Sequence, residues 1–168
     1  VRNTDWLAAN LKPFGCEWVQ IDDGWQGRGD GLGTNRDFLV TCERDFPKGM
    51  KWIADYIRAK GLRPGIWCIP CTQSNAELFK ARPRLFIRRP DGTSPGVHEK
   101  PLVDWKPDWK MAREDAYVNW GGMYYIDPTS REGRDYFKRL FRMICREWGY
   151  EYVKIDNQFA TRTGWRQT

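Results

Sequence analysis

One pattern occurs twice in this chain: Gly15-Cys16-Glu17-Trp18-Val19-Gln20-Ile21-Asp22 is repeated as Gly149-Tyr150-Glu151-Tyr152-Val153-Lys154-Ile155-Asp156, with Gly, Glu, Val, Ile and Asp in common. A looser third copy is Gly61-Leu62-Arg63-Pro64-Gly65-Ile66-Trp67-Cys68-Ile69. Each copy opens with the glycine that commonly ends a helix in a left-handed turn, and continues as a short apolar strand. Helix, glycine and apolar strand in repetition are typical of βα units on a parallel sheet. We therefore expect an α/β fold.

A helix-like segment precedes each copy of the pattern. The clearest one follows Thr129 and Glu132, which have the spacing of a capping box. Its apolar side chains form the stripe of a helix that is buried along one side. They are Tyr136, Phe137, Leu140, Phe141, Ile144, Cys145 and Trp148. We expect further helices at about 49–60 and at about 5–12, where Pro13 ends the segment.

Both near-identical copies end in aspartate, at Asp22 and at Asp156. In parallel α/β folds the loops that form sites leave from the carboxyl ends of the strands. Because side chains alternate along a strand, Lys154 lies on the same face as Asp156, where its ammonium group favours the ionised carboxylate. A nucleophilic carboxylate needs that state. The simpler interpretation of this pair is an internal ion pair.

The stretch Asp22-Asp23-Gly24-Trp25 is the sharpest local signal for a site. Two adjacent carboxylates can accept hydrogen bonds from a polyol and a tryptophan offers an apolar face, so the set suits a sugar. The simpler interpretation is that one aspartate caps a helix and that Trp25 is buried. A cation site at Asp22, Asp23 and Asp156 is a further alternative. The lysine two residues before Asp156 argues against it, because an ammonium group competes with a metal ion.

Composition excludes several classes of protein. The 168 residues allow one domain or part of a larger one, and 40% apolar residues with 10 Trp exclude a disordered chain. No apolar run approaches the roughly 18 residues of a membrane span. The net charge of +6 is well mixed and the basic run at 80–89 has no nucleic-acid motif beside it, so we expect neither a membrane nor nucleic acid as partner. With His98 as the only histidine and no second pair beside Cys68 and Cys71, we expect neither a metal site nor a redox site at these cysteines.

A long stretch at 70–125 is rich in proline and glycine, and we expect it to be an irregular insert within the domain. Loops of this length in compact domains are usually functional lids or inserts. Its aromatic side chains either form the wall of a sugar pocket or pack the insert onto the domain. They are Trp105, Trp109, Trp120, Tyr124 and Tyr125.

Five motifs follow one another along the chain. They are Asp22-Asp23-Gly24-Trp25 after a strand, Phe46-Pro47-Lys48-Gly49-Met50, Gly61-Leu62-Arg63-Pro64-Gly65-Ile66-Trp67, Asp127-Pro128 before a helix, and Tyr152-Val153-Lys154-Ile155-Asp156. In this order the chain resembles, over nearly its whole length, the α-galactosidases of glycoside hydrolase family 36, the melibiase and raffinose-synthase-like group of clan D. The resemblance implies a (β/α)8 TIM barrel, of which the chain supplies about strands 2 to 4 with their helices and a long insert after strand 3.

The same resemblance implies an activity and a set of site residues. The activity is retaining hydrolysis of terminal α-galactosides by double displacement, without a metal or another cofactor. By position, Asp156 is similar to the nucleophile of the family and Lys154 to the lysine that contacts both nucleophile and sugar. Asp22 and Asp23 are similar to the pair that binds the galactose O4 and O6 hydroxyls, and Trp67 to a tryptophan of the sugar pocket. The expected partner is an α-galactoside oligosaccharide.

The length of the chain limits this expectation. A complete barrel takes roughly 250 residues, so we expect residues 1–168 to be a fragment of one catalytic barrel. Retaining hydrolysis needs a second carboxylate, and no Asp or Glu follows Asp156. We expect the isolated chain to be inactive and, because apolar strand edges and helix faces stay exposed, to self-associate.

Two other functions stay open at this point. A transferase of the raffinose-synthase type uses the same carboxylates but passes the galactosyl group to a sugar instead of water. A non-catalytic carbohydrate-binding remnant that retains Asp22, Asp23 and Trp67 is the better interpretation if the chain is complete. Five cysteines, an odd number, slightly favour the cytoplasm. A homo-oligomeric full-length protein stays open.

Overall fold

The structure of the protein, a computed structural model, describes residues 1–27, 38–73, 76–94 and 124–156. At its centre lies a parallel sheet of three strands: β1 Trp18–Ile21, β2 Arg63–Cys68 and β5 Tyr152–Ile155. Their order in the sheet is β1-β2-β5, with Gln20 opposite Gly65 and Trp67 opposite Lys154. These are the strands that the repeated pattern predicts, so the α/β class and the parallel pairing are confirmed.

A glycine in the left-handed region precedes each of these strands, as the pattern also predicts. The φ angle is 94° at Gly15, 71° at Gly61 and 77° at Gly149. Residues with a side chain rarely adopt such an angle, and at Gly149 a Cβ atom would also meet the Arg58 guanidinium group at 2.6 Å. Each glycine therefore turns the chain from a helix into the strand that follows.

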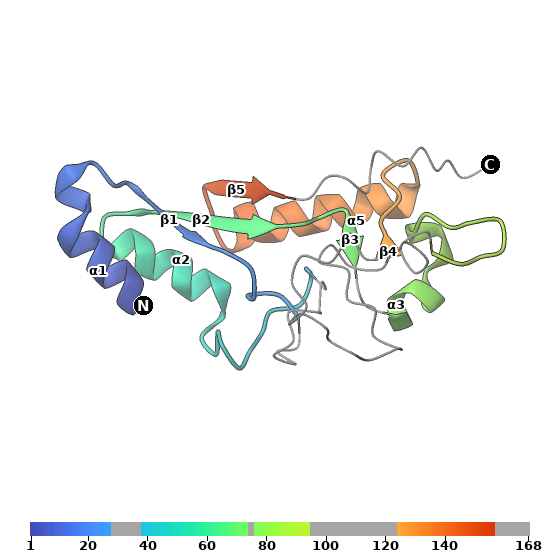
Figure 1. The fold of residues 1–168 in the computed structure, drawn as a ribbon, viewed down its shortest axis with the longest axis horizontal. Helices are drawn as coiled ribbons and strands as arrows, with labels where there is room; N and C mark the ends of the chain where they lie inside the picture. Colours follow the sequence, from blue (N-terminus) through green and yellow to red (C-terminus); the bar gives the residue numbers. More distant parts are fainter. Residues whose placement is uncertain (28–37, 74–75, 95–123, 157–168) are drawn as a thin grey trace, which may run out of the picture.

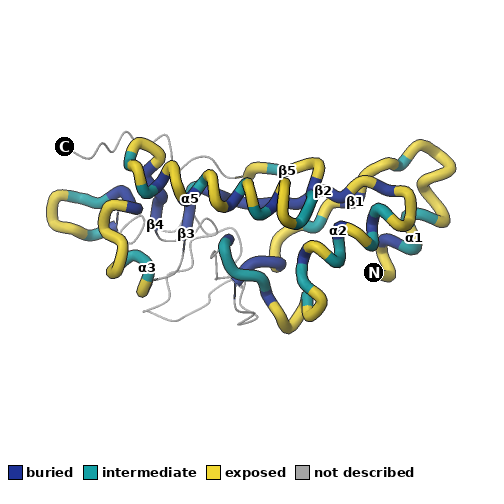
Figure 2. The backbone as a smooth tube through the Cα atoms, turned by 180° about the vertical axis from the view of Figure 1, so that it is seen from behind, coloured by how far each residue is buried: buried dark blue, intermediate teal, exposed yellow. Residues whose placement is uncertain are grey.

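Three helices lie along one face of the sheet: α1 Arg2–Asn10, α2 Gly49–Ala59 and α5 Arg131–Arg142 (Figure 1). The strand side chains turned toward them are Val19, Ile66 and Val153, which belong to the apolar core clusters. Figure 2 shows that β2 is the most buried strand of the parallel sheet, whereas β5 is partly exposed. Burial of this one face holds the helices and the sheet together and leaves the opposite face of the sheet for other contacts.

The first helix begins and ends earlier than the expected range of about 5–12. After α1 comes a 3₁₀ turn, η1 Lys12–Phe14, which contains Pro13. Proline needs no N–H partner in the first turn of a helix, so Pro13 starts this turn instead of ending α1. In contrast, α2 agrees with the expected range of about 49–60. Within the described ranges, no helix is long and apolar enough to cross a membrane.

Ser130, and not Thr129, caps the last helix. The Ser130 hydroxyl accepts a hydrogen bond of 2.9 Å from the Gly133 N–H, so the cap lies one residue later than the predicted capping box. The helix then continues as a π turn, η4 Met143–Glu147, whose backbone bonds span one residue more than those of an α-helix. The predicted stripe is buried at three positions: Tyr136, Leu140 and Ile144.

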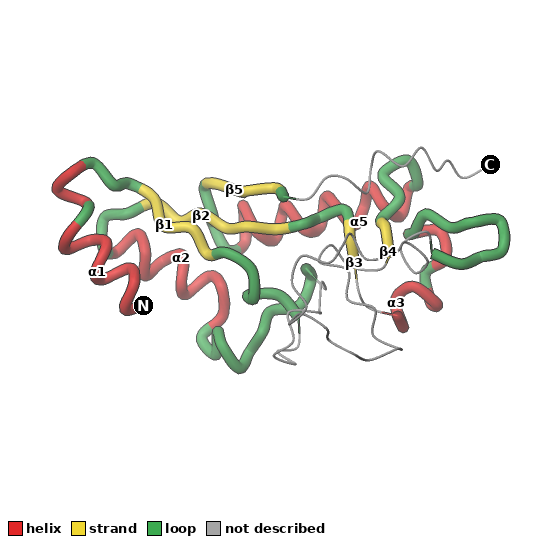
Figure 3. Tube along the Cα trace, in the orientation of Figure 1, coloured by secondary structure: helices red, strands yellow, loops and turns green. Residues whose placement is uncertain are grey.

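The stretch at 70–125 contains regular elements where we expected irregular chain. They are β3 Thr72–Gln73, α3 Ala76–Ala81, the 3₁₀ turn η2 Pro83–Leu85 and β4 Tyr124–Tyr125. Pairing of β3 with β4 forms a second, antiparallel sheet (Figure 3), which satisfies backbone groups that an irregular loop would leave to water. Tyr124 and Tyr125 are buried there and pack the stretch onto the domain. The other aromatic candidates lie outside the described residues: Trp105, Trp109 and Trp120.

Candidate functional site

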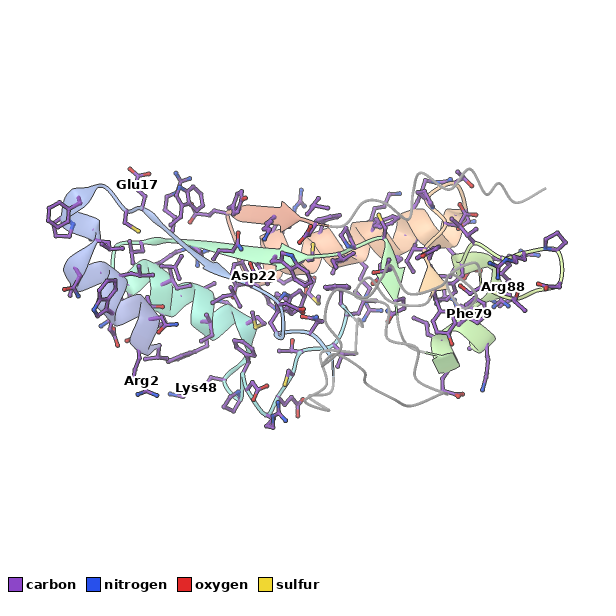
Figure 4. The ribbon with its side chains drawn as sticks, in the orientation of Figure 1. Arg2, Glu17, Asp22, Lys48, Phe79 and Arg88 are labelled. Atoms are coloured by element: carbon purple, nitrogen blue, oxygen red, sulfur yellow. The ribbon has the colours of Figure 1, made fainter. Side chains whose placement is uncertain are left out.

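The candidate site residues gather at the carboxyl-terminal edge of the parallel sheet. Asp22 follows β1, Trp67 lies near the end of β2, and β5 contributes Lys154 and, one residue beyond its end, Asp156. Figure 4 labels Asp22 where β1 ends. Because the parallel register sets Trp67 opposite Lys154, residues far apart in the sequence reach one another across the sheet.

Asp156 is anchored to β2 by two hydrogen bonds. Its backbone N–H donates to the Cys68 carbonyl at 3.0 Å, which continues the parallel ladder just past the end of β5. Its Oδ2 accepts a hydrogen bond of 3.0 Å from the indole Nε1 of Trp67. Hydrogen bonds to a carboxylate hold it in one orientation. A fixed orientation suits a carboxylate that acts as a nucleophile.

Lys154 forms its ion pair across the sheet with Asp22. Its Nζ lies 3.5 Å from Asp22 Oδ2, and the two side chains are 41% and 56% exposed. Such an exposed pair contributes no more than about 1 kcal/mol to stability. The simpler interpretation paired Lys154 with Asp156. In the structure the Lys154 ammonium group instead connects β5 to the end of β1, at an accessible edge of the sheet.

Asp23 lies beside Asp22 in the turn after β1, and both side chains are exposed. The Asp23 backbone N–H donates to Asp22 Oδ1 at 2.9 Å. The Oδ1 atom of Asp23 accepts a hydrogen bond of 2.6 Å from the side-chain amide of Gln26. In the part of this turn that the structure describes, neither aspartate caps a helix, so the carboxylates are presented at the edge of the sheet.

Trp25 is a core residue, and the expectation that it offers a face to a sugar is wrong. Its side chain is completely buried, and its Nε1 donates a hydrogen bond of 2.7 Å to the Trp67 carbonyl. Trp148 packs edge to face against it, with the ring centroids 5.5 Å apart. Trp25 thus joins the turn after β1 to the end of β2. Burial of the large apolar surface of its indole is favourable, which explains why Trp25 lies in the core and not at the surface.

Trp67 is 2% exposed, and Phe38 lies beside its ring at a centroid distance of 6.1 Å. Its polar N–H edge reaches Asp156, while its ring contributes to the core. Its contribution to a sugar pocket stays a prediction.

Sequence reasoning did not find two glutamines that contact the candidate site residues. Gln20 donates to Asp22 Oδ2 at 2.5 Å, and Gln26 donates to Asp23. Alternation along β1 is a signal that would have found Gln20, because residues 20 and 22 share one face of the strand. No local pattern indicates Gln26, since a turn brings it back onto the carboxylate.

The described cysteines and acidic groups show no metal centre. Within the described ranges, no cluster of three His, Cys, Asp or Glu side chains is placed to hold a metal ion. Burial raises the pKa of the Cys68 thiol to about 12 and also raises the pKa of Cys71, so both are poor nucleophiles at neutral pH. The basic run at 80–89 is exposed over residues 80–84 and buried at 85–87, and it includes the ion pair of Arg82 with Glu132.

A cavity of about 470 Å³ lies at the other end of the sheet, where the strands begin. Its lining comes from the segments that precede β1 and β2 and from the first residue of β2: Lys12, Gly15, Cys16, Glu17, Gly61 and Arg63. The length of a strand separates the two ends of the sheet. This cavity is therefore not part of the edge that presents Asp22 and Asp156.

Comparisons with known proteins give the family of this chain. Residues 3–100, more than half of the chain, match the family model Melibiase. The α-galactosidase A of Cellvibrio japonicus is 41% identical over 61 residues, which cover 36% of this chain and 14% of that protein. The α-galactosidase of Escherichia coli is 29% identical over 152 residues, which cover 89% of this chain and 18% of that protein.

Among solved structures, TtGalA, an α-galactosidase from Thermus thermophilus in complex with stachyose, is 31% identical to this chain. The superposition has a TM-score of 0.58 and covers 92% of this chain and 28% of that one. The chain thus spans a small part of the length of the relatives it matches, 14% and 18% of the two curated proteins above. On the match to the family model, the chain belongs to the Melibiase family.

Proposed function

We propose that this chain is the nucleophile-bearing part of the catalytic barrel of an α-galactosidase, and that the whole protein hydrolyses terminal α-galactosides. The observation that carries the proposal is the 3.0 Å hydrogen bond between Trp67 Nε1 and Asp156 Oδ2, at the edge where Asp22 and Lys154 meet. Membership of the Melibiase family and the likeness to an α-galactosidase in complex with stachyose support the substrate class.

In the proposed reaction, Asp156 attacks the anomeric carbon of the galactosyl unit. The bond from this carbon to the leaving oxygen breaks, and an acid outside this chain protonates that oxygen. Water, deprotonated by the same group, then attacks the anomeric carbon and releases Asp156. Two inversions give net retention of configuration.

The other site residues hold the sugar during these steps. Asp22 and Asp23 accept hydrogen bonds from the O4 and O6 hydroxyls, and Lys154 contacts the sugar beside the nucleophile. Trp67 orients Asp156 and closes one side of the sugar pocket. This assignment follows from the positions of the residues in the motifs, and their gathering at one edge of the sheet supports it.

The three parallel strands with helices on one face support an assignment to about strands 2 to 4 of a (β/α)8 barrel. In that arrangement the face away from the helices lines the interior, and residues 70–125 are an insert after strand 3. Trp18 and Tyr152 on that face are 37% and 46% exposed, and Phe14 is 86% exposed. We therefore propose that residues 1–168, taken alone, self-associate, because these apolar groups lack the cover of further strands. We also propose that they are inactive, because the acid of the proposed reaction lies outside them.

The test uses the protein encoded by the full reading frame that contains residues 1–168. Asp156→Ala should abolish hydrolysis of p-nitrophenyl α-D-galactoside with little change in the melting temperature, because this side chain is exposed. Added azide should restore turnover and give β-galactosyl azide, since azide enters from the face that the carboxylate has left. Asp135→Ala, which removes an exposed carboxylate on α5, is the control.

Retained hydrolysis by Asp156→Ala would contradict the nucleophile assignment. Product analysis with and without an acceptor sugar separates the hydrolase from a transferase that uses the same carboxylates. A full-length protein that binds galactosides but hydrolyses none would be a carbohydrate-binding protein.

A further inference from the structure

We propose that Gln26 is a positioning residue that orients the Asp23 carboxylate and so sets how strongly the site selects the galactose hydroxyl bound by Asp23. The inference rests on the proposed function and names a further residue that contributes to its specificity for galactose. It starts from a direct contact: Gln26 Nε2 donates a hydrogen bond of 2.6 Å to Asp23 Oδ1.

The orientation of the Gln26 amide is determined by a second contact. Its Oε1 accepts a hydrogen bond of 3.2 Å from the Gly24 backbone N–H. A backbone N–H can only donate, so the oxygen of the amide must face Gly24 and the NH₂ group must face Asp23. The opposite orientation would set the amide oxygen against a carboxylate oxygen and would lose both bonds.

Gln26 is also held rigidly, which distinguishes it from a surface glutamine. Its side chain is 5% exposed, and its backbone forms a bridge with Thr41. The neighbouring backbone is bonded on both sides, by Cys42 N–H to the Trp25 carbonyl at 2.8 Å and by Gly27 N–H to the Val40 carbonyl at 2.7 Å. Because folding has already restricted this side chain, its hydrogen bond orients Asp23 with little further entropic cost.

Asp22 provides an internal comparison. It receives its own amide donor, from Gln20 at 2.5 Å, but Gln20 is exposed and projects from β1. Each of the two adjacent carboxylates thus has one glutamine, and only the glutamine beside Asp23 is buried. A site built to bond a hydroxyl rejects an analogue without that hydroxyl because its polar group is then left unpaired. Asp22 is also contacted by the Asp23 N–H at 2.9 Å and by Lys154 at 3.5 Å, whereas the structure assigns the orientation of Asp23 to the buried Gln26.

The experiment measures selection for individual hydroxyls in the full-length protein. Gln26→Met removes both amide contacts at similar size, and Gln26→Glu keeps the acceptor for the Gly24 N–H but removes the donor to Asp23. For each, kcat/KM is measured on p-nitrophenyl α-D-galactoside and on its 2-deoxy, 4-deoxy and 6-deoxy analogues. Gln20→Met is the matched variant on the other carboxylate.

We expect both Gln26 variants to lower kcat/KM on the intact galactoside by about tenfold, since a hydrogen bond to a charged group is disturbed. The loss should nearly vanish on one analogue, either the 4-deoxy or the 6-deoxy sugar, and persist on the 2-deoxy sugar. For Gln20→Met, the loss of kcat/KM should nearly vanish on the other of these two analogues.

An equal loss on all four substrates, with a lowered melting temperature, would mean that Gln26 only stabilises the turn, and would overturn the inference. Unchanged kinetics in both variants would overturn it as well. A wild-type protein without activity on the intact galactoside would instead remove the proposed function itself. The two failures are therefore distinguishable.

Discussion

The indole of Trp67 connects the buried core to an exposed carboxylate: its Nε1 donates a hydrogen bond of 3.0 Å to Asp156 Oδ2. The backbone carbonyl of the same residue accepts a hydrogen bond of 2.7 Å from Trp25. Core packing around Trp25 and Trp67 therefore sets where Asp156 stands at the edge of the sheet.

Trp67→Phe separates this positioning from packing. The change removes the N–H donor and keeps an aromatic ring, so kcat on an α-galactoside should fall by about tenfold or more, as expected for loss of a hydrogen bond to a charged group. Trp25→Phe is the companion variant. It removes the hydrogen bond from Trp25 to the Trp67 carbonyl and shrinks a buried side chain, and it should cost about 2–4 kcal/mol of unfolding free energy. Denaturant unfolding and steady-state kinetics on both proteins check this, and a Trp67→Phe enzyme with unaltered kcat would contradict it.

Lys154→Met should separate function from stability at the other cross-strand contact. The pair with Asp22 is exposed, so its loss should change the free energy of unfolding by less than about 1 kcal/mol. The proposed contact of the ammonium group with sugar and nucleophile predicts a fall in kcat/KM of about tenfold or more. Lys51→Met, which breaks the exposed pair with Asp55 on α2, is the control and should leave kcat/KM unchanged.

Gly133→Ala should destabilise the protein, although alanine is ordinarily the better helix former. A Cβ atom at this position would lie 1.8 Å from the Asp127 carbonyl oxygen, which is backbone and cannot turn away. The clash exceeds the gain of roughly 1 kcal/mol that alanine brings to a helix interior, so a net loss of several kcal/mol is expected. Thermal unfolding measures it. A melting temperature equal to or above that of the wild type would show that the start of α5 can shift.

Stability should fall as the pH rises from about 9 to about 12. Burial holds the pKa of the Cys68 thiol at about 12 against an ordinary value of 9.0, so the unfolded chain loses this proton first. The contribution of the protonated Cys68 thiol to the free energy of unfolding is fully present below pH 9 and is lost as the pH approaches 12. The loss for this group is up to about 4 kcal/mol. Cys68→Ala should flatten that slope in urea unfolding measured at several pH values. An equally steep slope in the variant would assign the effect to other groups.

Local pattern was sufficient for much of the fold. Gly15, Gly61 and Gly149 have the positive φ angles that their places before strands predict. The strands they introduce pair in parallel, and Asp22 and Asp156 end at one edge of the sheet. These features depend on backbone angles and on side-chain alternation, which neighbouring residues determine.

Tertiary contacts decided the details of the site. Thr129 and Ser130 are both acceptable caps, but the Thr129 hydroxyl donates to Asp127 Oδ1 at 2.7 Å and Ser130 caps α5. The sequence alone determined that Asp22, Asp23, Trp67 and Asp156 come at the carboxyl ends of parallel strands. The tertiary structure decided that the indole N–H of Trp67 meets Asp156 and that Gln26 turns back onto Asp23. The physical reason is that a hydrogen bond needs two atoms within about 3 Å in a defined direction, and only the packed core brings such atoms together across strands or a returning turn.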